Sequence, residues 1–205
     1  MRKVWKSFRF CLLLTFAIWL GTVMFDRQLL HDQLIRLHVV ANSDSAEDQA
    51  VKLQVRDAIV ESLEGDLQNI GDLEQVKAYL QENLPKIQAI ANRVLEAAGF
   101  RETAQVSLQK EAFDIRYYDT FTLPAGVYEA LRVTIGEGQG KNWWCVVFPT
   151  LCLPATAAEF EDVAAGSGFS RELTRTLEGE DGYELRFYLL ELLGRVENIF
   201  FEGGI

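Results

Sequence analysis

The chain has 205 residues, of which 49% are hydrophobic, 24% charged and 11% aromatic. This is enough apolar material for one compact domain with a short appendage, and it excludes a disordered chain. The formal net charge is −10, and residues 26–205 alone carry 16 basic and 30 acidic side chains. That acidity argues against nucleic acid as a partner, because phosphate backbones bind positive faces.

The first 25 residues have the layout of an export segment. An uncharged stretch of sixteen residues runs from Phe10 to Phe25, which resembles the apolar region of a secretory signal. The cations that precede it are Arg2, Lys3, Lys6 and Arg9. Sixteen residues fall slightly below the ~17–25 of a full bilayer span, and Trp19 or Leu20 fits a small-residue cleavage site poorly. We favour a membrane anchor over residues 1–25 and leave a cleaved signal peptide open; in both cases residues 26–205 form a single extracytoplasmic domain.

The exported part begins with a predicted strand from Leu34 to Asn42, because side chains alternate there with a period of two. One face is apolar, and the other carries Arg36, His38 and Asn42. A helix follows, since Ser45 and Asp48 have the spacing of a capping box. Its outer face is expected to carry Asp48, Lys52 and Arg56, and Gly65 is its expected end.

Helical periodicity returns from Asp72 to Ala98, where Pro85 is expected to break the helix in two or to kink it. After Gly99 the period changes to two. The segments 105–118 and 128–136 predict a β-hairpin with a turn at residues 124–126. The segment 142–148 is apolar on both faces, which predicts a central strand that is covered on both sides.

The last third combines a predicted mobile loop with a predicted helix. Small and acidic residues dominate 153–182, which is typical of a loop. Residues 183–201 predict a helix that caps the sheet, with contact to a membrane surface as the alternative. The whole pattern predicts an α+β fold: an antiparallel-rich sheet packed with several helices and preceded by a single N-terminal hydrophobic export segment.

No motif in the chain predicts a cofactor, a metal or a catalytic centre. The G-E-G-Q-G-K run at 136–141 lacks the spacing of a phosphate-binding loop and lies between two strands. The two histidines, His31 and His38, lie more than a hundred residues before the exported cysteines, which matches no structural zinc spacing. A hydrolase acting through His38 and Asp44 stays open as an alternative, although nothing in the sequence orients the base. A module that binds a small ligand is the other alternative.

Two cysteines, Cys145 and Cys152, lie in the exported part with Pro149 between them. Export places them in a compartment that permits a disulfide. The bridge requires the chain to fold back over residues 149–151. A disulfide and two buried thiols are therefore both open.

Two long strings in the chain are unusual enough to compare with known families. The first is IRLHVVANSDS at 35–45, continued by residues 47–49 and 53–57. The second runs through LPAG at 123–126, residues 128–133, and 135 through NWWC at 142–145 to residues 148–149 and 151–152. In this order they resemble the stage II sporulation protein R family of endospore-forming bacteria. Thr150 stands where the family pattern has a second proline, and Ala46 stands where it has a proline at the helix start. The resemblance spans roughly residues 34–200.

The resemblance implies a signalling protein rather than an enzyme. Such a protein is made in the forespore and exported into the space between the two septal membranes. There it triggers a membrane-embedded aspartic protease in the mother cell, which removes the pro-sequence of sporulation sigma factor E. Residues 10–25 would hold the chain in the membrane if they are not cleaved.

The resemblance carries no known site residues, so the sequence alone must suggest the surface that meets the protease. We expect it on the polar strand face, the turn that follows and the outer helix face. The alternative is that these side chains serve capping and salt bridges. The residues are Arg36, His38, Asn42, Asp44, Asp48, Lys52 and Arg56.

Overall fold

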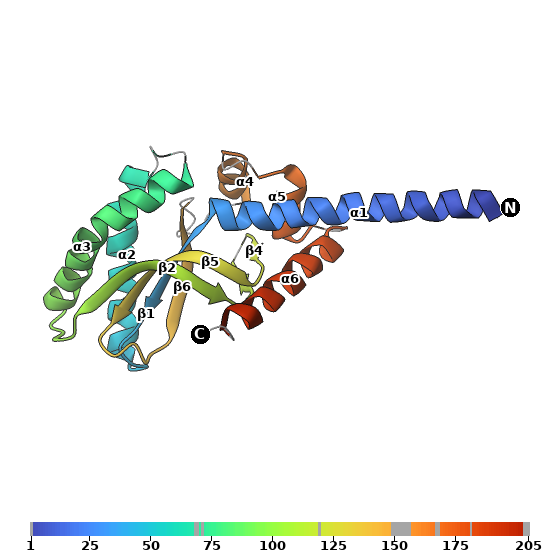
Figure 1. Ribbon diagram of the computed structural model, residues 1–205. Coiled ribbons are helices and arrows are strands. Elements are labelled where there is room, and N and C mark those ends of the chain that lie inside the picture. Colours follow the sequence, from blue (N-terminus) through green and yellow to red (C-terminus); the bar gives the residue numbers. More distant parts are fainter. Residues whose placement is uncertain are drawn as a thin grey trace.

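The computed structural model describes residues 2–67, 70, 72–118, 120–148, 157–166, 169–180 and 182–202. A four-stranded sheet in the order β2-β5-β1-β6 lies at the centre, with helices on both faces (Figure 1). The predicted α+β class is confirmed. The helices and strands are α1 Arg2–Gln33, β1 Ile35–Val40, α2 Ala46–Leu67, α3 Leu73–Ala97, β2 Ala104–Phe113, β3 Arg116–Tyr117, β4 Thr122–Leu123, β5 Gly126–Ile135, β6 Asn142–Phe148, α4 Ala157–Gly166, α5 Arg171–Glu178 and α6 Glu184–Glu202.

Two apolar cores lie on opposite faces of the sheet. The first joins α2 and α3 to the odd-numbered residues of β1, such as Leu37 and Val39. The second joins α1, α4, α5 and α6 to the other face, through residues such as Tyr128 and Val146. All six residues of β1 are buried. The expected strand is therefore correct in position, but its polar side chains face the second core rather than the surface.

The predicted pairing of the segments after Gly99 is confirmed, although their connection differs. β2 pairs with β5 in an antiparallel register. The expected turn at 124–126 is not where the chain reverses. A small ribbon of β3 and β4 makes the reversal, and the Tyr118 N–H donates to the Phe121 carbonyl at 2.9 Å.

Three further expectations are corrected. β6 is covered on both faces but lies at the edge of the sheet, because burial of the two faces does not determine whether a second strand pairs with it. α3 is one helix through Pro85 rather than two, and Leu80 and Ile87 on either side of the proline pack in the same core. The described part of 153–182 forms α4 and α5 rather than a loop.

Helix α1 belongs partly to the domain and partly extends away from it (Figure 1). Its outer side chains from Val4 to Ile18 are largely exposed, while Val23 and Leu30 lie in the second core. Among the described residues it is the one helix long and apolar enough to cross a membrane, over Val4–Gln33. The carboxylate of Asp26 is buried against the guanidinium of Arg186 on α6, with the Nε of Arg186 donating at 2.8 Å. This pair connects the end of the uncharged stretch to the last helix.

Candidate functional site

Arg36, the first residue of the expected binding surface, is fully buried. Its guanidinium carbon lies 4.1 Å from the centre of the Phe113 ring and 5.1 Å from that of Tyr128, and one nitrogen donates to the Tyr118 hydroxyl at 3.1 Å. Aromatic rings therefore hold this cation inside the second core. The expected exposure of Arg36 is wrong.

His38 is also buried, and its partner is Glu111 rather than Asp44. The Nδ1 atom of His38 lies 2.7 Å from a Glu111 carboxylate oxygen, and the ring stacks on Trp144. The other Glu111 oxygen accepts from Arg132 at 2.9 Å. Burial raises the pKa of the Glu111 carboxyl, but the hydrogen bonds from His38 and Arg132 outweigh it, so the net shift is downward.

The Nε2 atom of His38 is buried without a hydrogen-bond partner among the described residues. Asp44 instead accepts a hydrogen bond from the Lys141 N–H at 2.7 Å. The structure therefore does not bring His38 and Asp44 together as a base and its orienting acid, which a Ser-His-Asp site requires.

The turn after β1 interlocks with the 136–141 loop between β5 and β6. The Asn42 side chain accepts from the Glu137 N–H at 3.0 Å, and the Gly140 N–H donates to the Ala41 carbonyl at 2.9 Å. A Cβ added at Gly140 would lie 2.2 Å from the Ser43 carbonyl oxygen, so only glycine fits there. The glycine-rich run thus serves as a close backbone contact.

The side chains expected on the outer face of α2 support this interlock. Asp48 is buried and accepts from the Ser43 hydroxyl at 2.5 Å, while Ser45 caps the helix by accepting from the Asp48 N–H at 3.0 Å. Lys52 is buried and donates to the Lys141 carbonyl at 3.0 Å. Burial also lowers the pKa of the Lys52 amine. The expected outer face is therefore wrong for Asp48 and Lys52, because these groups satisfy the loop and the cap.

Of the expected surface residues, Asp44 is exposed, and Asn42 and Arg56 are half-buried. Arg56 lies over the Trp143 ring, 4.3 Å from its centre, and pairs with Asp57. Cys145 is disulfide-bonded and Cys11 is free. Cys152, the expected partner of Cys145, lies outside the described residues.

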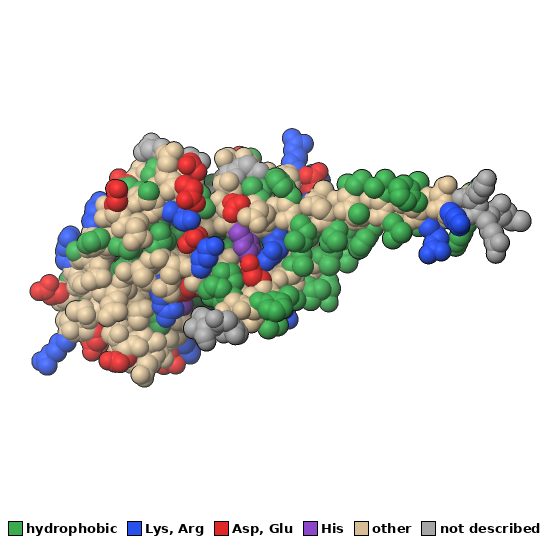
Figure 2. Space-filling view, in the orientation of Figure 1, with side chains coloured by type: hydrophobic (Ala, Val, Ile, Leu, Met, Phe, Trp, Pro, Cys, Tyr) green, Lys and Arg blue, Asp and Glu red, His purple; other side chains and the backbone are tan. Residues whose placement is uncertain are grey.

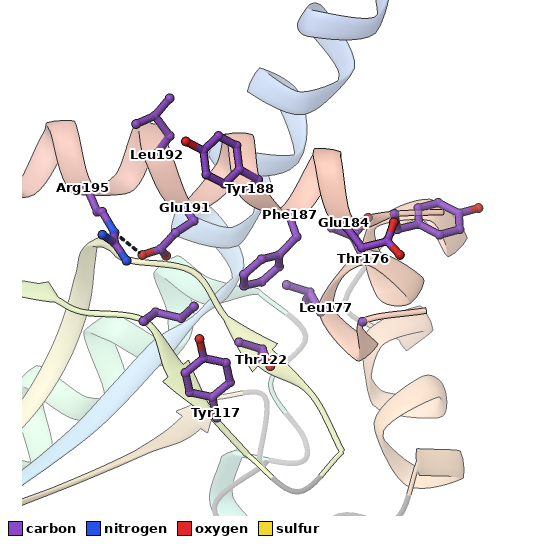
Figure 3. Close-up of a pocket in the computed structure, with 13 residues that line it drawn as sticks. Tyr117, Thr122, Thr176, Leu177, Glu184, Phe187, Tyr188, Glu191, Leu192 and Arg195 are labelled. Carbon is purple, nitrogen blue, oxygen red and sulfur yellow. Dashed lines mark hydrogen bonds and ion pairs between the residues drawn. The ribbon is translucent and has the colours of Figure 1, made fainter. Parts of the chain in front are cut away.

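A groove of about 610 Å³ lies elsewhere, between α6, α5 and the β3–β4 ribbon. Figure 3 shows side chains from all three converging on it, with Tyr117 and Thr122 from the ribbon opposite the helix residues. The lining is mainly aromatic and aliphatic. It comprises Ile115, Tyr117, Thr122, Thr176, Leu177, Gly179, Tyr183, Glu184, Phe187, Tyr188, Glu191, Leu192 and Arg195.

Two charged groups of the groove, Glu191 and Arg195, pair with each other. Glu191 is buried, and its two carboxylate oxygens accept from the Ala125 N–H at 2.7 Å and from the Arg195 Nε at 2.6 Å. Its carboxylate therefore fixes the chain at the start of β5 and is not a free acid. The groove suits apolar and aromatic groups of a partner better than it suits acid–base chemistry.

Reasoning from the sequence did not find this groove. Its residues come from separate segments, 115–122 and 176–195, and the first lies in the expected hairpin. One usable signal was the aromatic cluster of Tyr183, Phe187 and Tyr188 at the start of the last helix. Among the described residues, no cluster of three or more His, Cys, Asp or Glu side chains is placed to hold a metal ion.

A family model and a curated relative both match this chain, and both carry the same family name. The family model for stage II sporulation protein R matches residues 31–158. The stage II sporulation protein R of Bacillus subtilis (strain 168) is 35% identical over 179 residues, which cover 78% of this chain and 80% of that protein. No solved structure matches the chain.

The interlock of the two turns predicts a specific destabilisation. Gly140→Ala should lower the free energy of unfolding by about 1–3 kcal/mol, because the new Cβ forces the two backbones apart. Gly65→Ala is the control: an added Cβ there has no atom within 4 Å, and alanine in a helix is favoured by up to ~1 kcal/mol. Urea unfolding of both variants measures the difference. Equal stability of the two variants would contradict the interlock.

The Glu111 cluster predicts a pH dependence. Because the folded-state pKa lies below the ordinary value of 4.5, the ionised carboxylate stabilises the fold above pH 4.5, and this stabilisation is lost as pH falls through the lowered pKa. Glu111→Gln should cost about 1–3 kcal/mol at neutral pH. The difference in the free energy of unfolding between this variant and the unmodified chain should become smaller in acid. Unfolding curves of both chains from neutral pH to below pH 4.5 test this prediction. A difference in stability that does not change with pH would contradict the charge-based explanation.

Proposed function

The chain belongs to the stage II sporulation protein R family and so has a role in sporulation; from this we propose that it is an exported signal that activates a membrane-embedded aspartic protease. That protease would remove the pro-sequence of sporulation sigma factor E. The chain would act from the space between the two septal membranes, after export across the forespore membrane. It would act by contact, without chemistry of its own.

The position of the groove is the observation that best supports a partner reached from the space between the two septal membranes. α6 lines the groove, and Arg186 on the same helix pairs with Asp26 at the end of the uncharged stretch of α1. If α1 spans a membrane, the groove lies next to the membrane surface. The groove would then lie in the space between the two septal membranes, which the mother-cell membrane, the expected location of the protease, borders on its other side.

The chemistry of the groove also favours a protein partner. Tyr117 and Tyr188 are 76% and 61% exposed beside it. Exposed tyrosines next to an apolar groove are typical of protein interfaces, where aromatic side chains dominate the binding energy. We therefore propose that the groove, rather than the β1–α2 turn, receives the protease.

A small apolar ligand is the second candidate for the groove. Its volume lies in the range of ligand pockets, roughly 300–1,000 Å³. Such a ligand would be held by shape, because Glu191 and Arg195 pair with each other. The hydrolase alternative is not supported, because His38 and Asp44 are engaged with different partners.

A charge introduced into the groove should impair signalling without changing the stability of the fold. Tyr117→Asp places a carboxylate on an exposed ribbon position, so the thermal melt should change little. It should reduce processing of the pro-sigma factor at least tenfold, since an aspartate buried against an apolar partner loses its hydration. The matched control is Leu53→Asp on α2, which is also exposed but lies outside the groove lining. Processing in sporulating cells and a melt of each purified chain are the two measurements.

Normal processing with Tyr117→Asp would remove the groove from the proposed contact. Loss of processing in both variants would show a general sensitivity to surface charge and would equally count against the groove. A fall limited to Tyr117→Asp, with both melts unchanged, is the result that the proposal predicts.

A further inference from the structure

Helix α6 carries a continuous apolar stripe on its outer side. The residues are spaced three or four apart, so they lie along one side of the helix. All of them are at least 43% exposed, and Phe200 reaches 76%. They are Leu185, Tyr188, Leu192, Val196, Ile199 and Phe200.

The opposite side of α6 fixes the direction in which the stripe faces. Leu190 lies in the second core, and a Cβ added at Gly194 would lie 1.6 Å from the Ala125 carbonyl oxygen. The helix backbone therefore lies directly against the chain before β5. Because α6 cannot rotate in this packing, the stripe must face away from the domain.

Three contacts set the position of α6 along α1. Arg186 pairs with Asp26, and Glu197 pairs with Arg27 at 2.7 Å and lies 3.7 Å from His31. The first turn of α6 therefore lies beside the end of the uncharged stretch 10–25. The helix crosses α1 obliquely, and its C-terminal end lies farther from the N-terminal tip of α1 (Figure 1).

The length of the uncharged stretch places the domain at the membrane. Sixteen helical residues rise about 24 Å, whereas the hydrocarbon core is about 30 Å thick. The outer part of this stretch is also in contact with the domain, because Val23 lies in the second core and Trp19 packs against it. A spanning α1 therefore draws the adjoining surface of the domain into the interfacial region of the bilayer.

We propose that the stripe of α6 is a membrane-contact surface that lies in the outer interfacial layer of the same bilayer that α1 spans, with Leu185 deepest and Ile199 nearest to water. Figure 2 shows the apolar surface of α1 continuing onto the adjacent part of the domain, where α6 lies in Figure 1. The occupant is lipid, because the stripe continues the surface that α1 presents to lipid. A tyrosine at position 188 fits the interfacial region, where such side chains concentrate.

The charge of α6 predicts what kind of lipid contact this is. Helix α6 contains two arginines and four glutamates, so it lacks the excess of cations that anionic lipids attract. The contact therefore rests on burial of apolar area, and neutral phosphatidylcholine should suffice. This inference requires that α1 stays attached. The stripe shares Tyr188 and Leu192 with the groove lining, so lipid and the proposed protease would compete for these two side chains.

The test uses the full chain in nanodiscs of phosphatidylcholine. In a Cys11→Ser background, an environment-sensitive fluorophore is attached at Leu185→Cys, at Ile199→Cys and, as a control, at Gln54→Cys, which is exposed on α2. Brominated phosphatidylcholine quenches from within the bilayer, and iodide quenches from water. We expect bromolipid quenching several-fold stronger at 185 than at 54, with 199 between them, and the reverse order for iodide.

Equal iodide quenching at all three positions would overturn the proposal, because the stripe would then face water. Protection from iodide without bromolipid quenching would also overturn it, because another protein, such as a second copy of the chain, would then cover the stripe. Since 185 and 199 are exposed positions, the labels should leave the fold intact, and a melt of each labelled chain checks this. Addition of phosphatidylserine should not change the order.

Discussion

The buried ion pair between Asp26 and Arg186 is the contact on which the functional geometry depends. Asp26 is 2% exposed, and two nitrogens of Arg186 donate to the same carboxylate oxygen. A buried pair of this kind contributes little net stability, because desolvation of both groups offsets their attraction. Loss of one partner is costly, however, since it leaves a buried charge unpaired. The pair therefore selects one arrangement of α6 against α1, and the groove and the apolar stripe both take their positions from it.

The most recognisable strings of the sequence serve the fold rather than a surface. Arg36 lies among aromatic rings, and the turn after β1 is hydrogen-bonded to the 136–141 loop. Arg36 is buried, and the turn residues Asn42 and Asp44 are engaged in hydrogen bonds to the loop, which makes all three sensitive to substitution for structural reasons. The groove, in contrast, is lined by exposed side chains such as Tyr117 and Tyr188. Recognition of the family and location of its contact surface thus rest on different residues.

Local patterns in the sequence predicted the elements whose structure is decided locally. The period of two located β1, the Ser45 cap located the start of α2, and the separation of charge from apolar residues identified α1. Elements decided by distant partners were not predictable in this way. The partner of the buried His38 is Glu111, 73 residues away, and among the described strands β6 pairs with β1 alone, which places it at the edge. The groove was not predicted from the sequence for the same reason, since it exists only after α5 and α6 pack beside the β3–β4 ribbon.

A double-mutant cycle on the ion pair tests the central claim most directly. The full chain in phosphatidylcholine nanodiscs is compared with Asp26→Leu, Arg186→Met and the double variant, by the free energy of unfolding of each. We predict that Arg186→Met alone costs about 3–5 kcal/mol, and that adding Asp26→Leu restores most of this loss, because the buried carboxylate is then gone. If the losses of the two single variants sum to the loss of the double variant within ~0.5 kcal/mol, the two side chains do not interact. That result would contradict the placement of α6 at the membrane end of α1.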